Sequence, residues 1–352
     1  MRVAVVGVGL IGGSIGIAAR SQLGAHVTGW DPDPDALSAA RARDAVDAAA
    51  SSVGAALEGA DLAFVAAPVG ALPGVVDEVL RRAPAECAVT DVGSTKRAVA
   101  VDDPRFCGGH PLAGAETAGV HHARGDLFEG AVWYLTPTAR TSGILLERVH
   151  RAVAAFGARP VAIDPETHDR LMAGVSHLPH VLANVLVAQA AVALGGESIP
   201  STGPSFRDAT RVAGANSAIW TDIYLANRDA LVERIEDTVA RLSAVAAALR
   251  DGDAAAITSW NEAAAADRRA LLEAGLEGGS VHELRASVPN RPGVIAEIAL
   301  ALGRAGVNIV DMALSPSADF RQGRVSLWVS GGEHAARAEE LIAGLGFPVA
   351  RG

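Results

Sequence analysis

Residues 2–13, Arg-Val-Ala-Val-Val-Gly-Val-Gly-Leu-Ile-Gly-Gly, decide the fold of the first part of this 352-residue chain. The apolar, β-branched run at 2–6 predicts a buried strand, and a helix is expected from about 12 to 23. The intervening glycines match the G-x-G-x-x-G turn, and Asp31 ends a second apolar run about 20 residues further on. The combination predicts a dinucleotide-binding site at the end of the first strand.

Each glycine of this turn has a separate physical task. Gly7 permits the tight turn, Gly9 lets the backbone approach a pyrophosphate, and Gly12 allows the helix to pack closely on the strand. The N-terminus of the helix then stabilises the phosphate charge. The Asp31 carboxylate can accept a hydrogen bond from a ribose 2′-hydroxyl and would repel a 2′-phosphate, which favours NAD over NADP. The expected NAD-binding residues are Gly7, Gly9, Leu10, Ile11, Gly12, Asp31 and Ser94.

Outward from this turn, the chain divides into three zones. Apolar runs alternate with helical stretches up to about residue 164, which predicts a mostly parallel sheet covered on both faces. From about 165 to 274 the strand signals disappear and apolar residues recur at helical spacing, as expected for helices that pack against a second subunit. The remaining strands of the first zone are expected at 62–66, 88–91, 106–108, 131–135 and 161–163.

The last zone, from residue 281, has a different order of elements. A strand, a helix, two strands and a final helix predict a small ferredoxin-like unit. The predicted fold is therefore an α/β Rossmann domain, an all-α dimerisation domain and a small α+β domain. The expected boundaries are 1–164, 165–277 and 281–352.

Composition limits the function. A formal charge of −10 argues against general binding to nucleic acid, and no uninterrupted apolar run reaches the roughly 18 residues of a membrane helix. Cys87 and Cys107 suit a reducing compartment and have no metal-ligand spacing, and packing is the favoured role of Cys107, which has no activating partner nearby in the sequence. We expect a cytoplasmic protein that binds small molecules, with no metal, membrane or nucleic-acid partner.

A second informative stretch contains TDVGSTK at 90–96 and GGHPLAG at 108–114. It places His110 where a nicotinamide ring could lie, and a histidine there can take a proton from an alcohol. Ser94 could assist at the same place or cap a short helix. Lys96 is the only lysine among 30 basic residues, which leaves open a functional role or chance survival at the surface.

Six motifs occur together in a fixed order: VGVGLIGGSIG, TDVGSTK, GGHPLAG, VSHLPH, FRDATR and IWTDIYLAN. Over residues 1 to about 275 the chain thereby resembles the prephenate dehydrogenase family of tyrosine biosynthesis, including its arogenate-using relatives. The C-terminal unit separately resembles an ACT domain, a small amino-acid-sensing module. The first resemblance implies NAD-dependent oxidative decarboxylation, driven by aromatisation of the substrate ring and requiring no metal.

The resemblance also implies roles for particular residues. His110 matches the catalytic histidine that accepts the hydroxyl proton, and Ser94 matches a serine near the nicotinamide. Arg211 matches an arginine that binds a substrate carboxylate, a task suited to its planar fork. Substrate contact is the favoured role of His180, ahead of His177, and the alternative for one of the two is a packed histidine at the start of a helix. Glu116 could contact the substrate side chain or favour the ammonium of arogenate. Trp220 could line the pocket or belong to the core, and Arg207 could add positive potential.

In the ACT-like unit, the residues that match an amino-acid site are Asn290, Arg291, Pro292, Gly293 and Asn308. Feedback inhibition by tyrosine is the natural hypothesis, and a module that only assembles subunits is the alternative. The sequence does not decide between prephenate and arogenate as the substrate. A 3-hydroxyacid dehydrogenase would carry a lysine early in its helical domain, whereas Lys96 lies in the first domain. A non-catalytic sensor of NAD and amino acids would not need His110, Ser94 and Arg211 together.

Overall fold

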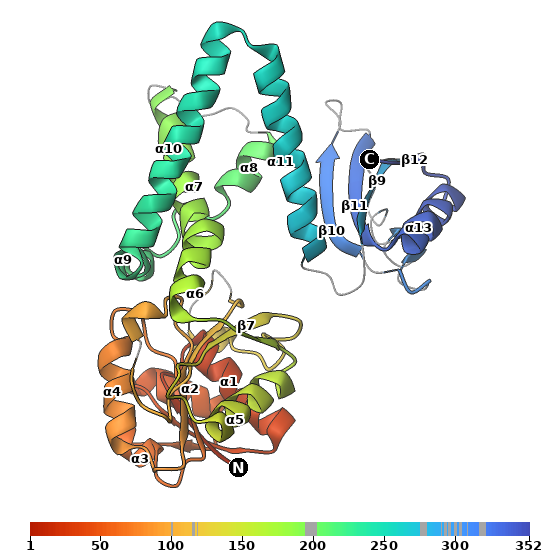
Figure 1. The fold of residues 1–352 in the computed structure, drawn as a ribbon. Coiled ribbons are helices and arrows are strands. Elements are labelled where there is room, and N and C mark those ends of the chain that lie inside the picture. The colour runs from red at the N-terminus through yellow and green to blue at the C-terminus, as the bar shows by residue number, and fades with distance from the viewer. Residues whose placement is uncertain are drawn as a thin grey trace. The chain divides into compact units, whose positions relative to one another are not determined.

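The computed structural model forms two compact units, Met1–Val239 and Ala240–Gly352, which divide within helix α10 (Arg228–Asp251) (Figure 1). The residues that the structure describes are 1–99, 101–114, 117, 119–193, 203–274, 280–289, 291, 294, 297–298, 301–302, 305–307, 309–316 and 322–352.

The first unit begins with a five-stranded parallel sheet in the order β3-β2-β1-β4-β5. Its central strand β1 is buried on both faces, because Val3 and Val5 enter one apolar core and Ala4 and Val6 enter another. Helices cover both faces, as the alternating pattern predicts. The elements are β1 (Arg2–Val6), α1 (Leu10–Leu23), β2 (His26–Trp30), α2 (Pro34–Ala42), β3 (Ala48–Ala49), α3 (Val53–Ala56), β4 (Leu62–Val65), α4 (Leu72–Arg82) and β5 (Ala88–Asp91).

A second, three-stranded sheet follows, in the order β6-β7-β8, with β6 antiparallel and β8 parallel to β7. The strand expected at 106–108 is displaced, so that His110 lies inside β6 and not in a loop. The reason is the pair Gly108 and Gly109: a Cβ on Gly109 would lie 2.5 Å from the Asp91 carbonyl oxygen, so only glycine lets β6 pass this close to β5. The elements are β6 (Gly108–Pro111), β7 (Val132–Thr136), α5 (Gly143–Ala155) and β8 (Arg159–Ala162), with short 3₁₀ turns η1 (Arg97–Val99) and η2 (Val120–His122).

The middle of the chain is helical, as predicted. One helical stretch, Pro165–Ala193, has the length and composition of a membrane-spanning helix, with a mean hydropathy of 1.5. One such stretch is weak evidence of a membrane span, because a core helix of a soluble protein passes the same test. Several of its apolar side chains, including Val185, Leu186 and Val192, are exposed. The elements are α6 (Pro165–Met172), the π-helical turn η3 (Ala173–His177), α7 (Leu178–Ala193), α8 (Pro204–Thr210), α9 (Ser217–Ala226), α10 and α11 (Ala254–Ala274).

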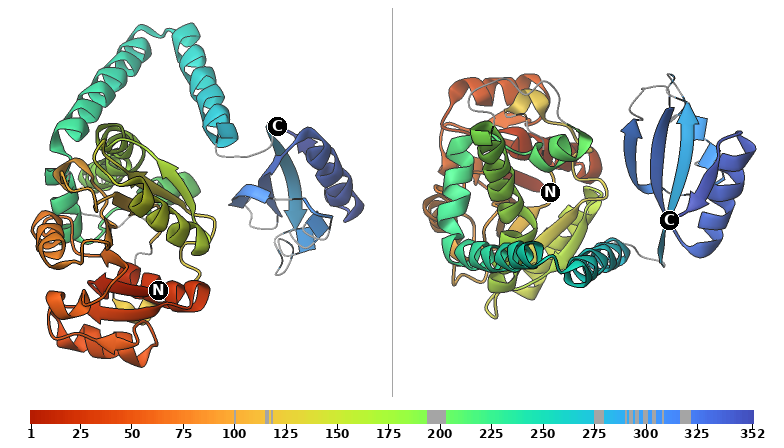
Figure 2. Two further views of the ribbon diagram at one scale, coloured as in Figure 1. Left: turned by 60° about the horizontal axis from the view of Figure 1, so that its bottom comes forward. Right: turned by 90° about the horizontal axis from the view of Figure 1, so that it is seen from above.

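The C-terminal part of the second unit is an antiparallel sheet in the order β10-β11-β9-β12. Helix α13 covers one face and closes a core that includes Leu284, Leu327 and Ile342 (Figure 2). Arg268 of α11 lies over the ring of Trp328, 4.6 Å from its centroid. These elements, β9 (Val281–Pro289), β10 (Ile309–Pro316), β11 (Gln322–Ser330), α13 (Gly332–Gly344) and β12 (Val349–Arg351), confirm the α+β unit.

Candidate active site

The turn between β1 and α1 is built to receive a phosphate. Gly7 has a φ of 95°, and a Cβ on Gly12 would overlap the Gly7 carbonyl oxygen, so both positions require glycine. A Cβ on Gly9 would meet nothing within 4 Å, so the space beside it is open. Gly9 caps α1 without a side-chain hydrogen bond, which leaves the first N–H groups of the helix directed into that space. The turn therefore fits a dinucleotide pyrophosphate.

Asp31 directly follows β2, and its carboxylate accepts two hydrogen bonds from backbone N–H groups. One carboxylate oxygen accepts a hydrogen bond from Val8 N at 2.8 Å, and the other accepts from Asp33 N at 2.9 Å. The first of these bonds ties Asp31 to the glycine turn itself. Each carboxylate oxygen has a second lone pair, so a ribose hydroxyl can still donate to Asp31.

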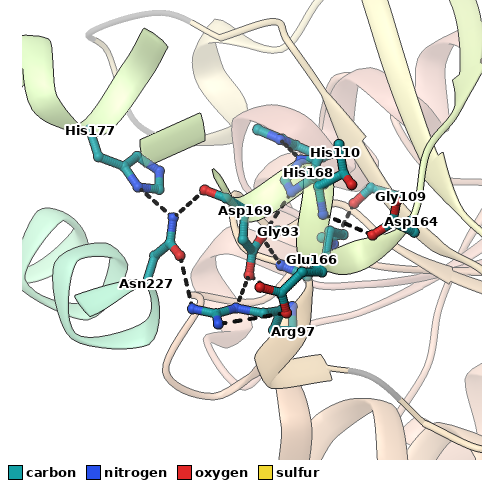
Figure 3. A network of polar contacts seen from close by, with 12 residues as sticks. Gly93, Arg97, Gly109, His110, Asp164, Glu166, His168, Asp169, His177 and Asn227 are labelled. Carbon is teal, nitrogen blue, oxygen red and sulfur yellow. Dashed lines mark hydrogen bonds and ion pairs between the residues drawn. The ribbon is translucent and has the colours of Figure 1, made fainter. Parts of the chain in front are cut away.

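His110 lies on β6, only 9% exposed, and contacts a second histidine. Its Nδ1 is 2.9 Å from Nε2 of His168, whose own Nδ1 is 2.8 Å from Oδ1 of Asp169 (Figure 3). Burial lowers the pKa of His110 well below its ordinary value, and positive charge on His168, Lys96 or His177 would lower it further. His110 is therefore neutral at pH 7 and able to accept a proton.

Lys96 is buried, which excludes the surface position that its sequence left open. Its ammonium pairs with the Asp91 carboxylate and donates to the carbonyl oxygen of Gly109 at 2.6 Å. The same carboxylate accepts from Gly93 N at 2.9 Å and Gly109 N at 3.1 Å. The pair thus joins the end of β5 to β6, next to the segment that carries half-buried Ser94. Its position indicates a structural role close to the site.

Asp169, on α6, links the helical part of the first unit to the loop after β5. Its carboxylate accepts hydrogen bonds from Lys96 N at 2.8 Å and Arg97 N at 2.9 Å. Its backbone carbonyl accepts from Nδ2 of Asn227 at 2.7 Å, and the same nitrogen lies 3.1 Å from Nδ1 of His177 (Figure 3). The network therefore fixes α6 and the end of α9 against the loop after β5.

The VSHLPH motif forms a π-helical turn followed by α7. Pro179 has no N–H to donate within a helix, and the wider turn at 173–177 accommodates it. This turn separates the two histidines into different surroundings. His177 is buried, and burial lowers its pKa to about 4 against a smaller opposing effect of Asp169.

His180 is half-buried and stacks on Trp220, with 3.5 Å between ring centroids and 26° between planes. Its Nδ1 is held by the Ser176 carbonyl oxygen at 3.0 Å. Burial lowers the pKa of His180; the Ser176 carbonyl opposes this effect, and the charge of Arg211 adds to it. His180, Trp220 and Arg211 therefore lie in one region. Arg207 is exposed one helical turn before Arg211.

Several expected site residues lie outside the described part of the chain: Glu116, Asn290, Pro292, Gly293 and Asn308. Of the ACT-like group, Arg291 is described, and it is paired with Glu297. The sequence reasoning missed His168, Asp169 and Asn227. Nothing in the local sequence distinguishes His168 and Asp169 from polar residues on the solvated first turns of a helix, since only the packing of α6 brings them to His110.

Both cysteines are buried and unpaired, which agrees with the packing role expected of Cys107. Burial raises the pKa of each thiol to about 12, so neither is a reactive thiolate near neutral pH.

A glycine turn that fits a dinucleotide pyrophosphate and a buried, neutral histidine that can accept a proton occur in the same unit, and this combination is typical of an NAD-linked dehydrogenase. Three family models match the chain: the nucleotide-binding domain of prephenate dehydrogenase at 15–162, the dimerization domain of prephenate dehydrogenase at 164–261, and the ACT domain at 282–329. The chain belongs to the prephenate dehydrogenase family.

Relatives that are aligned over most of the chain agree with this family. Prephenate dehydrogenase of Bacillus subtilis is 30% identical over 359 residues, which cover 96% of this chain and 94% of that protein. The probable prephenate dehydrogenase NovF of Streptomyces niveus is 34% identical over 314 residues, covering 86% and 81%.

Two solved structures are also similar. Arogenate dehydrogenase of Synechocystis has a TM-score of 0.67 and 27% identity, covering 76% of this chain and 99% of that one. Prephenate dehydrogenase of A. aeolicus, in complex with hydroxyphenyl propionate and NAD+, has a TM-score of 0.68 and 28% identity, covering 76% and 97%.

Proposed function

We propose that this protein catalyses the NAD-dependent oxidative decarboxylation of prephenate to 4-hydroxyphenylpyruvate in tyrosine biosynthesis. The observation that carries the proposal is the environment of His110, buried and neutral, with one ring nitrogen held by His168 and the other left for a substrate. The full-length relatives named prephenate dehydrogenase support the choice of substrate.

In the proposed reaction, the hydroxyl-bearing ring carbon loses a hydride and the hydroxyl proton goes to His110. The C–C bond to the ring carboxylate then breaks and carbon dioxide leaves, while the electron pair of that bond enters the ring. The resulting phenolate takes back a proton, for which protonated His110 is the proposed donor, to give the aromatic phenol. A positioned base of this kind contributes about 10²- to 10⁴-fold to the rate. Ser94 lies close in sequence to buried Lys96 and is proposed to hydrogen-bond the same hydroxyl.

NAD, when bound, accepts the hydride. Gly7, Gly9 and Gly12 shape its phosphate site, Leu10 and Ile11 contribute first-turn backbone of α1, and Asp31 receives the ribose.

The substrate is a dianion, and this acidic chain must hold it with local positive charge. Arg211 is proposed to bind a carboxylate in a bidentate manner, with Arg207 adding positive potential. His180 and Trp220 are stacked and offer a flat aromatic surface with a polar edge. His177 is proposed to support this group from the buried side, and Glu116 to contact the substrate side chain.

Arogenate is the second candidate substrate, because the similar Synechocystis structure is an arogenate dehydrogenase. The two substrates differ only in a keto group and an amine on the side chain, far from the reacting carbon. The same chemistry at His110 would serve both.

The decisive experiment is NADH formation by the purified protein with NAD and either prephenate or arogenate. We expect turnover with prephenate, loss of about 10²-fold or more in His110→Asn, and unchanged NAD binding in that variant. His121→Asn, at an exposed position, is the matched control. Turnover with arogenate alone would move the protein to the second candidate. The absence of NADH formation with both substrates, or an active His110→Asn variant, would refute the assignment.

We further propose a cytoplasmic homodimer. The exposed apolar side chains of α7, Val185, Leu186, Val187 and Val192, lie within the region that matches a dimerization domain. A partner subunit, and not a membrane, is the proposed cover for them. The match to an ACT domain supports an amino-acid effector, with tyrosine as the proposed ligand.

A further inference from the structure

Helix α6 delivers two buried side chains to the base. The helix begins after Asp164, whose carboxylate accepts a hydrogen bond from Thr167 N at 2.8 Å, and His168 and Asp169 follow directly on the inner side. Both are fully buried. Their contacts form a line that runs from the Asp169 carboxylate through the His168 ring to His110.

The protonation states of His168 and His110 follow from that of Asp169, to which His168 is hydrogen-bonded. Burial raises the pKa of the Asp169 carboxyl, but hydrogen bonds from His168, Arg97 N and Lys96 N outweigh that effect and hold the pKa below its ordinary value. Asp169 is therefore a carboxylate, and a carboxylate only accepts hydrogen bonds. His168 must accordingly carry its proton on Nδ1, the nitrogen that faces Asp169.

In the neutral form of His168 the single N–H is the one on Nδ1, and in that form its Nε2 is an acceptor. The atom 2.9 Å away from it is Nδ1 of His110, which must then donate. His110 is left with its lone pair on Nε2, the nitrogen turned away from His168. A general base needs that lone pair free, and the opposite tautomer of His110 would present an N–H to the substrate hydroxyl.

On this basis we propose that His168 and Asp169 are positioning residues for the reaction, fixing His110 in the tautomer with a basic Nε2 and stabilising the positive charge that it acquires. This inference rests on the proposed function of His110 as the base. The titratable groups that face His110 are Lys96 after β5, His177 on η3 and His168 itself, and the buried Asp169 carboxylate opposes the positive charge of the Lys96 ammonium. Tyr134 of β7 faces His168 edge-on, with ring centroids 5.5 Å apart.

The first test uses Asp169→Asn, which keeps the size of the side chain and removes its charge. We expect kcat to fall by at least about 10²-fold with KM for prephenate and NAD binding within about 3-fold of the parent, as when a triad aspartate is replaced by asparagine in a serine protease. The acid limb of the pH profile of kcat/KM should move to lower pH, because the protonated form of His110 loses a stabilising charge. An unmoved pH profile, or an effect on KM alone, would overturn the proposal.

The second test separates hydrogen bonding from folding. In His168→Gln the amide oxygen can still accept from His110 Nδ1, whereas His168→Leu removes the acceptor. We expect the glutamine variant to retain about tenfold more kcat than the leucine variant, with both matching the parent in circular dichroism. Equal kcat in the two variants would overturn the proposal.

The third test does not depend on turnover. Protein carrying ¹⁵N-labelled histidine, with the His110 signals assigned by comparison with His110→Asn, reports the tautomer directly by NMR. We expect a protonated Nδ1 and an unprotonated Nε2 in the parent, with this preference lost in His168→Leu. An unprotonated Nδ1 on His110 would overturn the proposal even in an active enzyme. Inactivity with both substrates together with the expected tautomer would refute the proposed function alone.

Discussion

Replacing Lys96 with methionine should destabilise the fold, because it leaves the Asp91 carboxylate buried without its counter-charge. Both members of the pair are buried, with side-chain exposures of 1% and 0%, so water cannot substitute for the lost ammonium. Removing one partner of a buried ion pair costs about 3–5 kcal/mol. The Gly109 carbonyl oxygen, which Lys96 also binds, loses a hydrogen bond in the same variant.

The assay is urea unfolding followed by circular dichroism, with hydrogen exchange of peptides from β5 and β6 as a local measurement. Faster exchange is expected in those peptides, because Asp91 holds the N–H groups of Gly93 and Gly109. Arg81→Met is the matched control, since its pair with Asp77 is exposed and its loss should change stability by less than about 0.5 kcal/mol.

A double variant, Asp91→Asn with Lys96→Met, completes the thermodynamic cycle. Its loss of stability should be smaller than the sum of the two single losses by about 1–3 kcal/mol, because neither charge then remains buried alone. A Lys96→Met protein within about 1 kcal/mol of the parent, or strict additivity in the double variant, would refute the reasoning.

Three further outcomes are expected. Gly9→Ala should fold normally and lose NAD affinity in a fluorescence titration, whereas Gly12→Ala should fail to fold, because only the second Cβ meets backbone; equal behaviour of the two would contradict the fit. The lowered pKa of His177 means that the unfolded chain binds its proton first as pH falls, so the related stability is complete above about pH 6.5 and decreases by about 3 kcal/mol toward pH 4. The difference between the urea midpoints at pH 6.5 and pH 4 should be smaller in His177→Gln than in the parent protein. An equal difference in both proteins would contradict the assignment of this pH dependence to His177. Tyrosine added to the active enzyme should reduce NADH formation and release or absorb binding heat; an unaffected rate and a flat calorimetric trace would remove the effector hypothesis.

Local sequence was sufficient wherever local geometry decides the structure. The turn at Gly7, Gly9 and Gly12 has one strand-to-helix conformation, because the positive φ of Gly7 and the close backbone contact at Gly12 exclude other residues at those two positions. The helices of the middle region and the positions of the strands along the chain in the last unit were also predicted correctly. These features depend on periodicity, which a single sequence displays.

The part that sequence could not predict depends on contacts between distant segments. His168 is 58 residues from His110 along the chain and 2.9 Å from it in space. The displaced strand β6 and the burial of Lys96 have the same origin, because the approach of β6 to β5 is set by tertiary packing against Gly108 and Gly109. The single lysine of this arginine-rich chain pointed to a special position, but its ion-pair partner, Asp91, is identified only by the three-dimensional structure.

The double use of Asp31 has a consequence for how this family can exchange one cofactor for another. Its carboxylate holds the Val8 N–H of the glycine turn, and the proposed contact with the ribose falls on the same group. A substitution that removes the negative charge to admit a 2′-phosphate therefore also loosens the turn that binds the pyrophosphate. A change that admits NADP would therefore need a second substitution that restores an acceptor for Val8 N, because a single substitution of Asp31 weakens the turn whichever cofactor binds.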